Sequence, residues 1–164
     1  MKVLESVERY FDAWNSNDGD AIAASFDPDG GYADPVSRQL YPTDIGAYAA
    51  ALFSAFPDLH FELHVTAVDE PKVVAQWTMT GTHLGTLNGL PPTEARIKLP
   101  GTDVITLGEA GILSVEGYFN QRTLPDQLGA QVTALPANVG PMEAKYGTAM
   151  HTGVWVPDHL NPQW

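Results

Sequence analysis

The spacing of apolar residues changes once along this chain, near Pro57, and this change constrains the fold more than any other feature. Before Pro57, apolar side chains recur every three or four residues, which is the period of one helix face. After it they alternate with polar side chains, which is the period of a β-strand. Helices followed by a series of strands predict an α+β fold.

Three helices are expected before Pro57. Their apolar positions are Val3, Val7, Tyr10, Phe11 and Trp14, then Ile22, Ala23 and Phe26 within residues 20–26, then Ile45, Tyr48, Ala49, Leu52, Phe53 and Phe56. The intervening DPDGGYADP, residues 27–35, predicts turns around a very short extended piece at 32–34. Pro35 supports this because it biases Asp34 away from helical angles.

Four extended runs are expected after Pro57, at about residues 61–67, 72–83, 95–107 and 112–120. In the first run, one face would carry Phe61, Leu63, Val65 and Ala67, and the other His60, Glu62, His64 and Thr66. Four residues of strand span about 13 Å, so His60 and His64 are too far apart to bind one metal ion. We therefore expect them to form part of a polar face.

A chain of 164 residues is expected to form one domain, which we place at residues 1–136. The segment 137–164 is irregular and rich in Gly and Pro, yet it keeps Trp155, Val156 and Trp164. Solvated linkers lack such large apolar groups. We therefore expect a C-terminal extension that packs on the domain or on a partner subunit.

Charge and composition exclude several classes of protein. Eight basic and twenty acidic residues give a net charge of −12, which opposes binding to nucleic acid. The absence of cysteine excludes disulfides and thiolate chemistry. No apolar run reaches the roughly 20 residues of a membrane span, and the N-terminus is charged and amphipathic, unlike a signal peptide. We expect a soluble cytoplasmic protein that binds neither membrane nor metal.

Three strings resemble the SnoaL-like polyketide cyclase family of the nuclear transport factor 2-like superfamily. They are AFPDLHFEL, KVVAQWTMTGTHLGTLNGLPPTEARIKLPGTDVITL and GILSVEGYFNQRTLPDQLG. The resemblance covers roughly residues 4–130. It implies a cone-shaped α+β barrel in which a curved antiparallel sheet and three N-terminal helices surround an interior pocket. It also implies an enzyme that uses no metal or cofactor, and we expect a homodimer formed through the open face of the sheet.

The family's acid/base is an aspartate seven residues before the glutamine of its QLG string, and this count falls here on Asn120. An amide forms hydrogen bonds but does not exchange a proton near neutral pH. A histidine that assists in some relatives falls at Thr106, which is also not titratable in this range. The ring-closing aldol mechanism of the family therefore cannot be carried over intact.

The front of the chain resembles a second branch of the superfamily, the ketosteroid isomerases. Those enzymes use a tyrosine on the first helix as an oxyanion donor and an aspartate before a proline as the base. ERYFDAW offers Tyr10 for the first role and YADP offers Asp34 for the second. The third isomerase group, a protonated aspartate on a late strand, again falls at Thr106. Two of the three groups are present.

Each catalytic candidate has a structural alternative. Asp34 is either a base in an apolar cavity or a turn residue whose carboxylate binds nearby amides. Tyr10 is either an oxyanion donor or a core aromatic residue. Glu116 shares strand parity with Tyr118 and Asn120, so it enters the pocket if Asn120 does, and stays in solvent if a bulge changes the parity.

The residues expected to bind substrate are mostly large and apolar, which predicts a hydrophobic small molecule. Trp14, Trp77 and Met79 would form the pocket wall, or simply the core. His83 would lie at the pocket mouth, or satisfy backbone groups where its strand ends. The full set is Trp14, Trp77, Met79, His83, Thr106 and Tyr118.

We expect a cofactor-independent cyclase or isomerase of secondary metabolism, such as antibiotic biosynthesis. It would move protons on a hydrophobic polyketide-like substrate, with Asp34 ahead of Glu116 as the acid/base. Two alternatives stay open: a module that binds a small molecule without chemistry, and a hydroxylase or epoxide-opening relative of the same fold.

Overall fold

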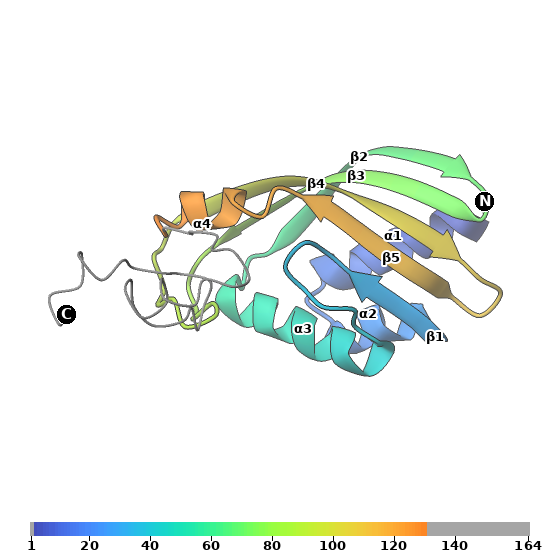
Figure 1. Cartoon of the computed structure of the whole chain (residues 1–164), viewed down its shortest axis with the longest axis horizontal. Helices are drawn as coiled ribbons and strands as arrows, with labels where there is room; N and C mark the ends of the chain where they lie inside the picture. Colours follow the sequence, from blue (N-terminus) through green and yellow to red (C-terminus); the bar gives the residue numbers. More distant parts are fainter. Residues whose placement is uncertain (1, 131–164) are drawn as a thin grey trace, which may run out of the picture.

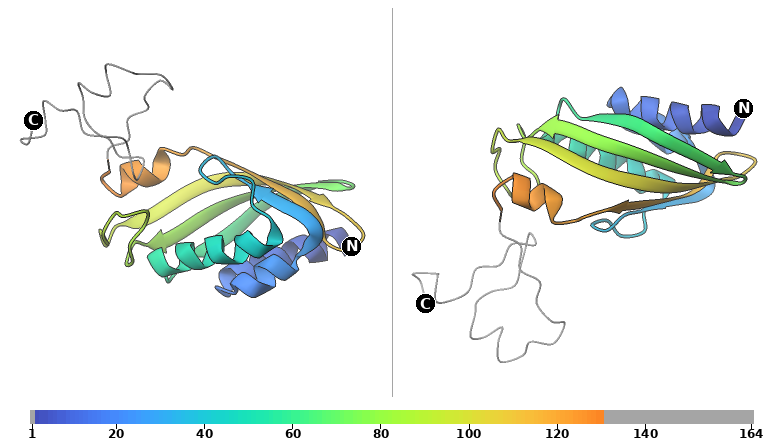
Figure 2. Two further views of the ribbon diagram at one scale, coloured as in Figure 1. Left: turned by 60° about the horizontal axis from the view of Figure 1, so that its bottom comes forward. Right: turned by 90° about the horizontal axis from the view of Figure 1, so that it is seen from above.

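The computed structural model describes residues 2–130 and has an α+β fold (Figure 1), as predicted. Three helices precede most of the sheet, which confirms the three N-terminal helices. They are α1 (Lys2–Asn15), α2 (Gly19–Ala24) and α3 (Pro42–Ala55), and a short α4 (Thr123–Gln127) follows the last strand. Helices α1, α2 and α3 all lie on one face of a curved, open sheet, and the other face carries none of them (Figure 2).

Five strands form that sheet in the order β1-β5-β4-β3-β2. Their bounds are β1 (Phe26–Ala33), β2 (His60–Asp69), β3 (Lys72–Thr82), β4 (Arg96–Leu107) and β5 (Ile112–Phe119). Neighbouring strands are antiparallel except β1, which runs parallel to β5. The four predicted extended runs all form strands with ends within about two residues of the expected ones.

The structure differs from the prediction at residues 26–33. Phe26 begins a strand instead of ending a helix, and the expected turn segment forms most of β1. Phe26 is 5% exposed and pairs with Ile112 of β5. A Cβ at Gly30 would overlap the Ile112 carbonyl oxygen, so glycine allows this close approach. Pairing with a distant strand has overridden the local turn composition.

A bulge divides β2 into two halves. Leu63 pairs with Trp77 but Val65 pairs with Gln76, so His64 is the extra residue and the alternation reverses there. The predicted single apolar face therefore ends at Leu63. The ring Nε2 of His64 lies 2.8 Å from Thr78 Oγ1, in agreement with a polar role. Within residues 2–130, no three His, Asp or Glu side chains are grouped as metal ligands would be.

The core lies between the helices and the concave face of the sheet, and aromatic rings dominate its α1 side. Tyr10 meets Phe11, Trp14 and Phe26 edge-on, with ring centroids 5.2, 6.4 and 5.8 Å apart. Trp14 in turn contacts Phe61 of β2 at 5.5 Å. Such pairs each add about 0.5–1.5 kcal/mol beyond their area burial. They fix α1 against the sheet.

Two side-chain amides extend the sheet as a backbone would. The Asn15 side chain donates to the Phe61 carbonyl and accepts from the Phe61 N–H, at 3.0 and 2.7 Å. The Gln127 side chain binds Lys98 in the same way, at 2.9 and 2.7 Å, at a point on β4 that β5 no longer covers. The glutamine of the QLG string therefore holds α4 on β4.

The predicted C-terminal extension, residues 137–164, lies outside the described residues, and its packing stays a prediction. In the part of the chain that is described, no helix combines the length and apolarity needed to cross a membrane.

Candidate functional site

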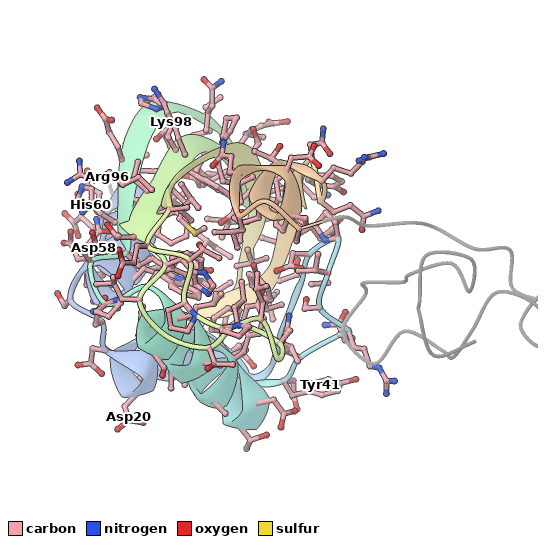
Figure 3. All side chains as sticks on the ribbon, turned by 90° about the vertical axis from the view of Figure 1, so that its left-hand side faces the viewer. Asp20, Tyr41, Asp58, His60, Arg96 and Lys98 are labelled. Carbon is pink, nitrogen blue, oxygen red and sulfur yellow. The ribbon has the colours of Figure 1, made fainter. Side chains whose placement is uncertain are left out.

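A cavity of about 240 Å³ lies between the helices and the concave face of the sheet. Viewed from the end that carries α4, many side chains project into the space between the helices and the sheet (Figure 3). The labelled Asp20, Tyr41 and Lys98 lie at the outside of the molecule. Eight aromatic residues line the cavity: Tyr10, Phe11, Trp14, Tyr32, Tyr48, Phe61, Trp77 and Phe119. Among residues 2–130, the lining includes two carboxyl groups, Asp34 and Asp103, and no Lys, Arg or His. The cavity suits a hydrophobic, ring-containing ligand.

Exposure separates the mouth of this cavity from its floor. Asn88 and Gln121 are exposed lining residues, whereas Tyr10 and Trp77 are buried. Asn88 belongs to a tight turn in which Leu87 and Leu90 exchange backbone hydrogen bonds. This is the glycine turn of GTLNGLPP, and it contributes Leu87 and Asn88 to the mouth. Both central residues have positive φ, 47° at Asn88 and 83° at Gly89, which suits Asn-Gly.

Asp34 is a turn residue that also lies at the cavity. Its Oδ1 accepts hydrogen bonds from the backbone N–H groups of Val36 and Ser37, at 2.8 and 2.7 Å, as a turn residue would. Its Oδ2 accepts from the hydroxyls of Tyr32 and Tyr48, at 2.8 and 2.7 Å, and lies at the cavity. Four donors fix the carboxylate in place, and they leave it few free lone pairs with which to take a proton from a ligand.

The tyrosines around Asp34 are held in their neutral form. Burial, followed by the neighbouring tyrosine hydroxyls, raises the pKa of Tyr32 well above its usual value. Burial and the charge of Asp34 do the same to the pKa of Tyr48. The pKa of Tyr10 is also raised, by burial first and then by Asp103. Each hydroxyl therefore remains a hydrogen-bond donor at neutral pH.

Asp103 is the site residue that the sequence analysis missed. It lies on β4, is 4% exposed, and has the indole N–H of Trp77 as a side-chain donor beside its carboxyl group. Burial raises its pKa to about 7, the indole of Trp77 lowers it somewhat, and the charge of Asp34 adds to the rise. A signal was available, because Asp103 shares its strand face with the buried Leu99 and Ile105.

Gly117 lets the two carboxyl groups come close together. It pairs with Asp103 across β4 and β5. A Cβ at this position would lie 3.2 Å from the Asp34 Cβ, 3.4 Å from Asp103 Oδ1 and 3.6 Å from the Tyr32 hydroxyl. A larger residue would push this cluster apart, so the glycine of VEGYF belongs to the architecture of the site.

Three predicted residues of β5 and its end lie on the wrong side of the sheet for the cavity. Glu116, Tyr118 and Asn120 share one face as expected, but all three are exposed. Glu116 Oε2 accepts from the Tyr118 hydroxyl at 3.0 Å, and Asn120 Oδ1 accepts from the Arg122 N–H at 3.0 Å. Phe119 lines the cavity instead. Of the two alternatives for Glu116, the structure has the one in which it stays in solvent, and Asn120 faces outward together with it, without a change of parity between them.

Thr106 and His83 also lie outside the cavity lining. Thr106 is three residues beyond Asp103 and so has the opposite strand parity. His83 is fully buried, with its Nδ1 accepting from the Thr93 N–H at 3.2 Å and its ring 5.4 Å from that of Phe56. Burial lowers its pKa. This agrees with its alternative, structural role where β3 ends.

Five predicted residues do line the cavity. Trp14, Trp77 and Met79 form wall, as expected, and Tyr10 and Asp34 lie in the same cavity despite their separation in sequence. The pairing of Asp34 with Tyr32 and Tyr48 was not expected.

Comparisons with known proteins agree with this architecture. The model of a family described as the SnoaL-like domain matches residues 7–115. No match was found among curated proteins. A putative hydroxylase, AclR from Streptomyces galilaeus, is 23% identical with a TM-score of 0.70, over 78% of this chain and 96% of that one.

Two further solved structures are similar. A putative SnoaL-like polyketide cyclase from Jannaschia is 21% identical with a TM-score of 0.71, over 78% of this chain and 92% of its own. A protein of ketosteroid isomerase-like fold from Catenulispora acidiphila, in complex with trimethylamine, is 17% identical with a TM-score of 0.69, over 80% and 98%. At these identities the likeness shows the fold alone.

Proposed function

The chain belongs to the SnoaL-like domain family, and we propose that it is a cofactor-independent enzyme that moves a proton on a hydrophobic, ring-containing ketone. The outcome would be cyclisation or isomerisation of a polyketide-like substrate. The observation that carries the proposal is Asp103, a buried carboxyl group that lines an aromatic cavity.

Asp103 has the properties that proton transfer requires. A general acid/base works best when its pKa lies near the working pH, and burial has raised the pKa of Asp103 to about 7. In its ionised form it would take a proton from the carbon next to a substrate carbonyl. The Tyr10 hydroxyl would donate to the oxygen on which charge develops. Asp103 would then return the proton to the substrate at a different atom.

Asp34 takes a different role from the one we expected for it. Its four hydrogen bonds hold its carboxylate in place, and its charge favours the protonated form of Asp103. It also orients the hydroxyls of Tyr32 and Tyr48 at the cavity wall. The residue types are those of the ketosteroid isomerases, with Asp103 rather than Thr106 at the late-strand position, but the proposed roles differ, because Asp103 and not Asp34 would act as the base.

The proposal is tested with 2-tetralone, a neutral bicyclic ketone with acidic hydrogens beside its carbonyl. Proton NMR in D₂O follows replacement of those hydrogens by deuterium. We expect the protein to accelerate exchange above the buffer rate, with the rate rising through about pH 7 as Asp103 ionises. Binding of 2-tetralone without accelerated exchange would instead support the small-molecule binding module.

The name of the Streptomyces galilaeus protein suggests a hydroxylase as the second candidate. Both candidates use the same apolar cavity, but only the first predicts exchange at carbon without any added oxidant. The exchange measurement therefore separates them.

We also propose a homodimer that pairs the helix-free face of the sheet. This face carries the exposed side chains of Val74 on β3 and Tyr118 on β5, 40% and 55% accessible. Sedimentation velocity is expected to give a dimer mass for the full chain and a smaller mass for Tyr118→Glu, because a buried carboxylate is costly. A monomer at all concentrations would contradict this. A cytoplasmic location stays a prediction.

A further inference from the structure

Trp77 has a buried donor without an acceptor. The residue lies on β3, is 4% exposed, and its Nε1 has no hydrogen-bond partner within the described residues. A buried N–H without an acceptor is destabilising and is uncommon in folded proteins. The groups around this N–H therefore show which acceptor it could serve.

The indole ring is fixed in one orientation by the strand next to it. Gly101 of β4 pairs directly with Trp77, and a Cβ there would overlap the six-membered part of the ring. Phe61 and Phe119 flank the ring, with centroids 5.1 and 6.4 Å away. The Nε1 cannot turn to another acceptor without displacing these groups.

Asp103 is an acceptor next to the ring, on the strand that pairs with Trp77. It follows Gly101 by two residues on the same face of β4, and the indole of Trp77 lowers the pKa of its carboxyl group. The contact does not reach hydrogen-bond geometry in this structure. Catalytic hydrogen bonds are often long in a free enzyme and shorten when charge develops.

We infer that Trp77 is a positioning residue whose indole N–H holds the Asp103 carboxylate when that group has lost its proton. The inference rests on the proposed proton transfer and adds the residue that steadies the ionised acid. Gly101 is part of the device, since it gives the ring its place on β4.

The other groups facing Asp103 cannot supply the same stabilisation. Asp34, on the segment after β1, carries a negative charge that opposes ionisation of Asp103. Tyr10 from α1 and Tyr32 from β1 interact with the Asp103 charge, but neither donates a hydrogen bond to it in this structure. Tyr48 from α3 donates to Asp34. Among the cavity-lining residues described, there is no Lys, Arg or His.

The test is a carboxyl ¹³C NMR titration of the full chain labelled at aspartate, with the Asp103 signal assigned by its loss in Asp103→Asn. Trp77→Phe keeps an aromatic ring and removes only the N–H. We expect the Asp103 midpoint to move upward by about half a pH unit or more, because a donor that favours the carboxylate is lost. Trp14→Phe, which changes another tryptophan of the same cavity, should move it less.

A midpoint in Trp77→Phe equal to that of the parent would overturn the inference, even if the variant were less stable. Gly101→Ala provides a second variant that displaces the ring, and it should shift the midpoint in the same direction. The titration needs no substrate. Absence of 2-tetralone exchange would therefore count against the proposed function alone, and an unchanged midpoint against the role of Trp77 alone.

Discussion

Asp103→Asn is expected to lower the rate of 2-tetralone exchange by about 100-fold or more, since a positioned general acid/base contributes about 10²–10⁴-fold. The substitution is nearly isosteric and removes only the titratable group. The residue is buried in the cavity wall, so the change should leave the cavity shape intact. Proton NMR measures the rate, and circular dichroism checks that the variant is folded.

Two matched carboxyl variants show whether the loss is specific. Glu116→Gln alters an exposed carboxylate on the neighbouring strand and should leave the rate unchanged. Asp34→Asn should give a smaller loss than Asp103→Asn, because it weakens the hold on Tyr32 and Tyr48. If Asp34→Asn abolished exchange and Asp103→Asn did not, Asp34 would be the base, as in the isomerase-like arrangement.

Periodicity was enough to predict the layers of the fold. The change near Pro57 separates helices from strands because each structure buries one face, and the face sets the spacing of apolar residues. The strand β1 could not be predicted in this way. Its composition is that of a turn, and it forms a strand by pairing with β5, which lies some 80 residues further on.

The site was harder to predict than the fold because it depends on register. Tyr10 and Asp34 were found by resemblance, and the wall by its bulk. Counting from the QLG string reached Asn120 and Thr106, which face away from the cavity. Strand parity is the better guide to Asp103. Leu99, Asp103 and Ile105 share one face of β4, so a regular strand that buries the two apolar residues also buries the aspartate.

The stability of the protein should also carry the signature of Asp103. The group binds its proton up to about pH 7 in the folded state, but only up to about 3.8 in the unfolded chain. Between these values the folded state holds more protons, so the contribution of Asp103 to the free energy of unfolding falls as pH rises. Above about pH 7 the group is ionised in both states, so its contribution to the free energy of unfolding no longer changes with pH.

The size of this effect makes it measurable. Each pH unit of difference corresponds to about 1.4 kcal/mol, so Asp103 would lower the free energy of unfolding by up to about 4 kcal/mol between pH 4 and pH 7. Asparagine cannot ionise, so Asp103→Asn should gain stability relative to the parent over this interval and keep a constant difference above it. Urea unfolding at a series of pH values gives the two curves.

Parallel curves for the parent and Asp103→Asn would mean that Asp103 ionises at its ordinary pH, and the proposed acid/base would then have no raised proton affinity to use. Diverging curves would show that the fold carries a carboxyl group at the expense of stability at neutral pH. Such a cost is typical of groups arranged for chemistry. Because unfolding requires no substrate, this result would bear on the proton-transfer mechanism before the natural ligand is identified.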